Sequence, residues 1–269
     1  IEEYGIPTID NWNRVVHNTM LKAYANVGDY QGACSWVELM DKKGIDMNPK
    51  ALGKLFSAAA RSGDVDVAEA LFPKALASHK PGRDRSRGRK ILWTMMLDAY
   101  AKRGCWEQAL QGLKAIRSTS VGVARQHFGA CINACAKARR PEEAQKLFDQ
   151  MLQVGLQVDA VEYTSLVDAY GQCGSYSKAA KTLKDMIAQG IEPSNGSFGA
   201  VINACSKAVK NEPGRGDALV PEVLEHLREM KRRGMQVHVE AYNSTIDTMA
   251  NASFMQGAKD LLQMKFAEG

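Results

Sequence analysis

The sequence has few of the features that mark membrane-spanning, disulfide-rich or disordered proteins. No run of about 18 apolar residues occurs, so no transmembrane helix is expected. Six cysteines among 269 residues are too few for a disulfide scaffold. Only eight prolines are present, hydrophobic residues make up 45% and charged residues 24%. These values are ordinary for a folded protein and favour helix.

Motifs for catalysis and for metal binding are also missing from the sequence. It contains no Ser-His-Asp ordering, no Gly-rich phosphate loop and no His-Glu-x2-His helix. Cys131 and Cys135 are four residues apart, but no further Cys or His pair completes a zinc site. We therefore expect a segment that is not an enzyme, with no metal, no cofactor and no small-molecule substrate. Because the first residue is Ile1 rather than Met, a targeting peptide would not be visible.

A pattern of about 35 residues repeats along the chain. Related stretches recur at 15–24, 50–59, 91–100, 126–135, 161–170, 196–205 and 240–249. Placing the first position one residue earlier gives repeats that start near 14, 49, 90, 125, 160, 195 and 239. The net charge of the whole chain is a modest +5, so the repeat is more informative than the charge.

Each repeat has the apolar spacing of two helices. A single hairpin cannot bury its apolar stripe, but stacked hairpins can. The sequence thus predicts an all-α solenoid of about seven two-helix repeats over residues 14–269, preceded by a tail or the end of an earlier repeat over 1–13. In the fifth repeat, the apolar positions of the two helices are Val161, Tyr163, Leu166, Val167 and Tyr170, then Ala179, Leu183, Met186 and Ile187.

The residue pattern of the fourth and fifth repeats resembles that of a known family. The residues that carry the likeness are Glu142-Glu143-Ala144, Leu147-Phe148, Met151, Gly155, Tyr163-Thr164-Ser165-Leu166, Asp168-Ala169-Tyr170, Gly174, Ala179-Ala180, Met186 and Gly190-Ile191-Glu192-Pro193-Ser194. They resemble the pentatricopeptide repeat, whereas the tetratricopeptide repeat has 34 residues and a different signature. The resemblance implies a right-handed α-solenoid that binds single-stranded RNA, one base per repeat.

The resemblance also implies roles for particular positions of each repeat. The fifth and last residues contact the base edge, the second packs on the base face, and a basic residue near the end of the first helix meets phosphate. Carried onto this sequence, the base-edge residues are Asn18, Asn48, Thr94, Thr164, Ser194 and Asn243; the base-face residues are Val15, Ile91 and Val161; the phosphate residues are Arg61, Lys102, Lys137 and Lys207. Basic residues at a helix end also favour the helix dipole without any ligand.

The alternate repeats depart from this pattern. Gly53, Gly129 and Gly199 occupy the base-edge position of the second, fourth and sixth repeats, and glycine can neither donate nor accept there through a side chain. Glu240 stands where an apolar base-face residue is expected. A reader of seven consecutive bases is therefore not expected.

A basic segment lies between the second and third repeats. Residues 80–90 carry six basic groups and one acid and are expected to form a loop. Arg83, Arg85, Arg87 and Arg89 would contact a polyanion through a salt-dependent term, although contact with an acidic protein or a simple solvated insertion also fits. A second insertion around residues 211–217 is expected to be a surface loop.

These observations favour an organellar RNA-binding adaptor, in a mitochondrion or plastid, that acts in transcript processing, stability or translation. The alternative is a structural subunit of a large organellar complex, such as a mitoribosome or a membrane complex. Such a subunit would bind protein partners or ribosomal RNA without reading bases. A third possibility is the RNA-recognition arm of a processing enzyme whose catalytic domain lies outside this segment.

Overall fold

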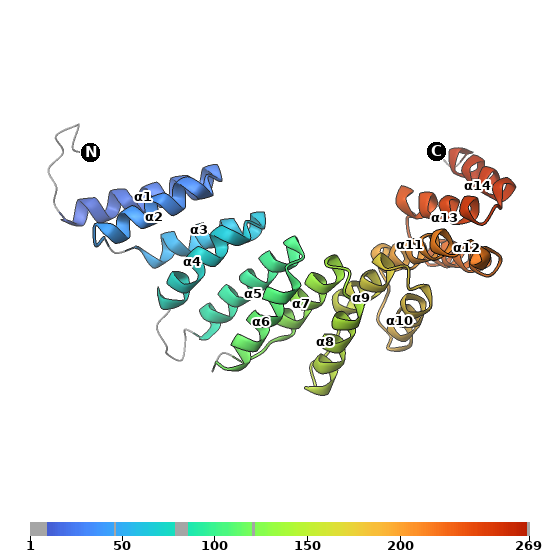
Figure 1. The fold of residues 1–269 in the computed structure, drawn as a ribbon, viewed down its shortest axis with the longest axis horizontal. Helices are drawn as coiled ribbons and strands as arrows, with labels where there is room; N and C mark the ends of the chain where they lie inside the picture. Colours follow the sequence, from blue (N-terminus) through green and yellow to red (C-terminus); the bar gives the residue numbers. More distant parts are fainter. Residues whose placement is uncertain (1–9, 46, 79–85, 120–121, 268–269) are drawn as a thin grey trace. The chain divides into compact units, whose positions relative to one another are not determined.

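The computed structural model describes residues 10–45, 47–78, 86–119 and 122–267, which form helices joined by short turns, with no strand among them (Figure 1). In the first half of the chain the helices are α1 (Asp10–Val27), α2 (Tyr30–Lys42), α3 (Pro49–Ser62), α4 (Val65–Ser78), α5 (Ser86–Arg103) and α6 (Trp106–Arg117). In the second half they are α7 (Arg125–Lys137), α8 (Pro141–Gln153), α9 (Ala160–Gln172), α10 (Tyr176–Ala188), α11 (Asn195–Asn211), the 3-10 helix η2 (Pro213–Arg215), α12 (Gly216–Arg232), α13 (Val239–Asn251) and α14 (Met255–Ala267).

The chain divides into two compact units, residues 1–123 and 124–269. Within the first unit, α1 packs on α3 and α3 on α5. Within the second, α7, α9, α11 and α13 pack in the same consecutive way. Within each unit, the first helix of a hairpin thus lies beside the first helices of its neighbours, and equivalent repeat positions recur along that row of helices.

Small residues let neighbouring first helices approach closely. A Cβ atom on Gly171 of α9 would lie only 2.6 Å from the backbone oxygen of Ala200 in α11. Large apolar side chains fill the space on either side, and Phe56, Phe128 and Phe198 are almost completely buried. Burying one such side chain stabilises the fold by roughly 1.5–3 kcal/mol, so stacking accounts for the stability that a single hairpin lacks.

The turn inside every hairpin except the sixth contains a left-handed residue. Gly63 ends α3 with a φ of 79°, and Gly174 adopts 69° between α9 and α10. Arg139 and Ser253 adopt φ values of 56° and 60° in the equivalent turns. This conformation costs a residue with a Cβ about 1–2 kcal/mol, so these two turns are strained where the others are relaxed.

The structure corrects the expected boundaries at three places. α5 begins at Ser86, so the prediction of a loop is wrong for residues 86–90, which continue the helix because Arg and Lys are good helix formers. The second insertion is an exposed connection at residues 211–215, as expected, but it is shorter than a loop over 211–217. α11 runs to Asn211, with Ala208 and Val209 buried in its last turn, and the 3-10 turn η2 leads directly into α12. α1 begins at Asp10 rather than near residue 14.

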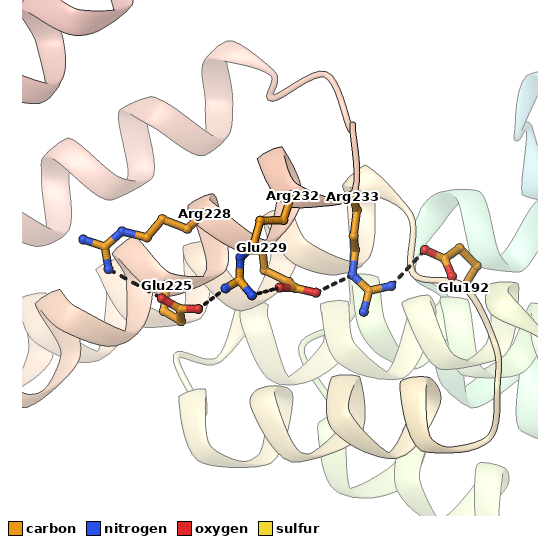
Figure 2. A network of polar contacts seen from close by, with 6 residues as sticks. All are labelled: Glu192, Glu225, Arg228, Glu229, Arg232 and Arg233. Carbon is orange, nitrogen blue, oxygen red and sulfur yellow. Dashed lines mark hydrogen bonds and ion pairs between the residues drawn. The ribbon is translucent and has the colours of Figure 1, made fainter.

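A chain of ion pairs runs along α12 and reaches the preceding linker (Figure 2). Arg233 donates to Glu229 at 2.7 Å and to Glu192, in the linker after α10, at 2.9 Å. Arg232 pairs with Glu229 and Glu225. The hydrogen bond from Arg233 lowers the pKa of Glu229. Figure 2 shows that the network ties the end of the sixth hairpin to the linker that follows the fifth.

Candidate nucleic-acid interface

The base-face positions present bare apolar side chains on the first helices. Val15 in α1, Ile91 in α5 and Val161 in α9 are 61%, 50% and 62% exposed. Each lies in the N-terminal half of its helix, at the same position of the repeat. Because the apolar core excludes them, these side chains contribute little to folding and remain available to a ligand.

Asn18, a predicted base-edge residue, is committed to the junction between α1 and α3. Its side chain is only 5% exposed. Its Nδ2 donates to the Arg14 carbonyl at 2.7 Å, and its Oδ1 accepts from the Asn48 backbone N–H at 2.6 Å. Asn48 in turn caps α3 by accepting from the Lys50 N–H at 2.9 Å. The first predicted base-reading pair therefore has a structural role of its own.

The two threonines that are predicted to contact base edges differ in their hydrogen bonds. The Thr94 hydroxyl donates to the Lys90 carbonyl of its own helix at 2.9 Å. Thr164 instead shares a hydrogen bond of 2.7 Å with the Ser197 hydroxyl of the next hairpin. Ser197 also lies 3.1 Å from the Ser194 hydroxyl, which caps α11. Asn243 in α13 is exposed. Base contact by these residues stays a prediction.

In the fourth repeat, a carboxylate from the next repeat fills the space beside the glycine. A Cβ on Gly129 would lie 3.0 Å from Oε1 of Glu162. Glu162 is 3% exposed and accepts from the Asp159 N–H at 3.0 Å, while Arg125 pairs with Asp159. Burial raises the pKa of Glu162. Burial would also raise the pKa of Asp159, but hydrogen bonds from its neighbours outweigh this and lower the pKa.

In the sixth repeat, the space beside the glycine is open. Nothing lies within 4 Å of a Cβ built on Gly199. A cavity of about 490 Å³ opens here between α9, α11 and α13. Its lining residues are Asp168, Asn195, Gly196, Gly199, Ala200, Asn203, Met230, His238, Glu240, Ala241 and Ser244.

Sequence reasoning missed this cavity, although a signal for it is present. The ninth residue of the third to seventh repeats is always Asp or Asn, at positions Asp98, Asn133, Asp168, Asn203 and Asp247. This residue lies about one helical turn after the base-edge position, so it faces the same side of the helix. Asp168 of the fifth repeat and Asn203 of the sixth are the two ninth residues that line the cavity.

Two of the four predicted phosphate residues bond to the hairpin before their own. Lys102 donates to the Arg61 carbonyl, and Lys207 donates to the Gln172 carbonyl at 3.1 Å and to its Oε1 at 3.0 Å. Lys137 is exposed. Each acceptor carbonyl ends the first helix of the hairpin before, where carbonyl groups lack helical partners. Phosphate binding stays a prediction for all four residues.

Two electrostatic effects bear on the ammonium of Lys207. Burial lowers its pKa, and the nearby Arg139 guanidinium lowers it further. An anion bound between these two cations would relieve their mutual repulsion.

The predicted basic loop is only partly within the described residues. Arg83 and Arg85 lie outside them. Arg87 and Arg89 belong to α5 rather than to a loop, and Arg89 is half-buried. In the described part of the chain, no helix is both long and apolar enough to cross a membrane.

Two family models match the chain. One, described as "Pentatricopeptide repeat-containing protein", matches residues 128–264. A second, described as "PPR repeat", matches residues 15–45 and 91–118.

Two curated relatives come from Arabidopsis thaliana. A mitochondrial pentatricopeptide repeat-containing protein is 23% identical over 236 residues, covering 87% of this chain and 39% of its own length. A chloroplastic one is 25% identical over 198 residues, covering 71% and 36%. The chain thus spans less than two fifths of the length of these relatives.

A solved structure has the same fold. The maize pentatricopeptide repeat protein PPR10, solved in complex with an 18-nt psaJ RNA element, superposes with a TM-score of 0.58 at 19% identity. The superposition covers all of this chain and 42% of the maize chain. The expected all-α fold of stacked hairpins is confirmed.

Proposed function

The chain belongs to the pentatricopeptide repeat family, and from this we propose that it binds single-stranded RNA along the first helices of its hairpins. Single-stranded RNA offers flat base faces for apolar packing and base edges for hydrogen bonds. On each first helix, the base-face position and the base-edge position lie within one turn of each other. An apolar side chain for the base face can therefore stand beside a polar side chain for the base edge. The maize protein with the same fold was solved with RNA, which supports the proposal.

One observation carries this function. Exposed apolar residues recur at the second position of the first, third and fifth repeats, at Val15, Ile91 and Val161. Bare apolar side chains at a fixed position of a repeat are typical of a surface that meets a repeating ligand. Stacking of bases on such platforms is tolerant of sequence, so the face can bind RNA even where edge contacts are few.

The bonding of the edge residues limits how much sequence the chain reads. Asn18 is held in the α1–α3 junction and Thr164 in a hydroxyl network. Asn243 and Ser194 are the exposed members of the set, and Ser194 also caps α11. We therefore propose weak base selectivity, with most of the affinity coming from stacking and from phosphate contacts.

The biological setting is a further part of the proposal. Curated relatives carry mitochondrial and chloroplastic names, which supports an organellar role for this chain. There it would act by binding, without catalysis by this segment, in the processing, stability or translation of a transcript. Protein partners of an organellar complex would contact other surfaces of the hairpins.

The test uses two valines of matched exposure. Val161 lies at the base-face position and is 62% exposed, whereas Val154, at the end of α8, is 60% exposed. Val161→Asp should weaken binding to a random single-stranded RNA pool by about tenfold, since it removes one stacking contact. Val154→Asp adds the same charge and should leave binding nearly unchanged.

A salt titration of the same binding separates the alternatives. Loss of affinity with rising salt, without enrichment of any sequence, would indicate backbone contact of the kind expected for ribosomal RNA. Absence of binding at low salt would reject the RNA proposal for this chain. The structural-subunit alternative would then be favoured.

A further inference from the structure

The cavity beside Gly199 is built to receive a flat ligand. Gly196 and Gly199 form one wall without side chains; nothing lies within 4 Å of a Cβ on Gly199, and the nearest atom to a Cβ on Gly196 is 3.4 Å away. Met230 and Ala241 contribute apolar surface. The volume of about 490 Å³ falls within the range of about 300–1,000 Å³ typical of small-ligand sites.

The walls of the cavity are held in place by the protein itself. Asn195 donates to the Gln236 carbonyl at 3.0 Å and lies 3.0 Å from His238 Nε2, which fixes the linker before α13. The close approach of Gly171 to Ala200 fixes the spacing of α9 and α11. The cavity therefore needs little rearrangement to accept a ligand, which lowers the entropic cost of binding.

The polar groups of the cavity are rich in acceptors. Asp168 accepts one hydrogen bond of 3.2 Å from Gln172, and an ionised carboxylate has about four acceptor sites in all. Asn203 adds an amide and Glu240 a second carboxylate at α13. A ligand that enters must offer N–H groups on the edge that faces Asp168.

Among the RNA bases, guanine matches this lining best. Its Watson–Crick edge carries a ring N–H beside an exocyclic amino group, and a carboxylate can accept from both at once in a bidentate pair. Uracil has one N–H flanked by two carbonyl oxygens, which a carboxylate repels. Adenine and cytosine have the amino group beside a ring nitrogen that is itself an acceptor.

We propose that the sixth repeat binds a guanine base in this cavity and that Asp168 determines the preference. The inference rests on the proposed RNA binding and deepens it. It assigns base selectivity to a repeat that has glycine at the base-edge position. Because glycine at position 199 contributes no side chain, a base can enter the cavity that Asp168, the ninth residue of the fifth repeat on α9, also lines. The fourth repeat cannot act in this way, since Glu162 fills the space beside Gly129.

The experiment measures binding of the whole chain to short pyrimidine oligoribonucleotides that carry a single G, A, U or C at each position in turn. Wild-type protein should bind best when G occupies one register, by about tenfold over U. Asp168→Asn keeps the shape and the bond from Gln172 but replaces one acceptor with a donor. It should abolish the preference for G without abolishing binding.

A second variant fills the cavity. Gly199→Leu should remove the preference for G in the same register. Gly53→Leu is the matched control: it makes the same change at the same repeat position, also with nothing within 4 Å, and should keep the preference. A side chain at either site points into open space, so both variants should fold, which circular dichroism would verify.

The outcomes separate this inference from the proposal that it rests on. Equal binding of all four bases by wild-type protein, or a G preference that survives both Asp168→Asn and Gly199→Leu, would overturn the cavity assignment and leave RNA binding intact. Failure to bind any oligoribonucleotide would overturn both. Displacement of bound RNA by an arginine peptide in wild-type protein but not in Gly199→Leu, with no preference for G, would assign the cavity to a protein partner instead.

Discussion

Asn18 and Asn243 occupy the same position of the first and the seventh repeat, yet their surroundings differ. In α1 the Asn18 side chain is 5% exposed and bridges to Asn48 in the linker before α3. In α13 the Asn243 side chain is exposed. The residue type is the same, so the difference comes from what the neighbouring segments place against it.

The glycines at the same repeat position teach the same lesson. Gly129 faces a buried carboxylate of the next hairpin, whereas Gly53 and Gly199 face open space. A repeat position therefore specifies where a side chain lies, while the start of the following hairpin decides what it contacts. Role cannot be assigned from repeat position alone.

The largest expected effect separates the two asparagines. Asn18→Ala removes the acceptor of the Asn48 N–H and should lower the free energy of unfolding by about 1–3 kcal/mol, the cost of an unsatisfied buried polar group. Asn243→Ala should change it by less than about 0.5 kcal/mol, as is usual at the surface. Urea unfolding of both variants checks this. Equal losses of unfolding free energy in Asn18→Ala and Asn243→Ala would show that the two asparagines do not differ in structural role.

The glycine pair should respond in opposite directions. Gly53→Ala should raise the free energy of unfolding by about 0.5–1 kcal/mol, because alanine favours helix and the space is open. Gly129→Ala gains the same propensity but presses a Cβ against Glu162 at 3.0 Å, and should show a net loss. Thermal unfolding measures both, and a gain at Gly129 equal to that at Gly53 would contradict the crowding by Glu162.

The pH dependence of stability should have a maximum set by Asp159 and Glu162. The pKa of Asp159 is lowered from 3.8, so its contribution is present above that value and is lost as the pH falls below it. The pKa of Glu162 is raised from 4.5; its protonated form is favoured in the folded state, so stability declines as the pH rises from 4.5 through the raised value.

Glu162→Gln tests the second of these windows. Glutamine can still accept from the Asp159 N–H, as in a capping box, but it does not titrate. Urea unfolding measured across the range above pH 4.5 should show a decline for wild-type protein and a smaller decline for the variant, in which burial still raises the pKa of Asp98. A decline of unchanged size in Glu162→Gln would assign the pH dependence to another group.

The smallest expected effect concerns the base-face position, where Val161 in the fifth repeat contrasts with Glu240 in the seventh. Glu240→Val would remove an exposed negative charge that repels phosphate and restore an apolar surface. RNA affinity should rise by about two- to fivefold, the scale of one exposed charge interaction. The rise should be similar for A, U and C and smaller for G, because Glu240 also lines the cavity beside Gly199. A rise confined to G would contradict this explanation.

The repeat and the helical hairpins could be predicted from the sequence, because apolar periodicity and turn glycines are local signals. Val161 shows the limit of such signals: its spacing places it on the apolar stripe of its helix, yet the side chain is 62% exposed. The length of α11 could not be predicted from them either. Polar and glycine residues around 211–217 suggested a loop over that range, but α11 runs to Asn211, with Ala208 and Val209 buried in its last turn, and η2 leads directly into α12.

The contacts between hairpins were beyond sequence reasoning for a physical reason. Glu162 reads as a surface acid that opens a helix, and only the packing of α7 on α9 brings its carboxylate to Gly129. Asp168 likewise reads as one acid in a repeated motif until the absent side chains of Gly196 and Gly199 expose it. Such contacts depend on pairs of residues in different repeats, whereas periodicity describes one repeat at a time.

The lysine contacts between neighbouring hairpins have a consequence for how such a chain can change over time. Lys102 and Lys207 each bond to a carbonyl at the equivalent position one hairpin earlier, where one residue is Arg61 and the other Gln172. Each joint includes a backbone carbonyl as an acceptor, which every amino acid supplies. A joint of this kind is indifferent to which hairpin precedes it, so whole hairpins can be duplicated, deleted or exchanged within a gene while the joint is remade each time.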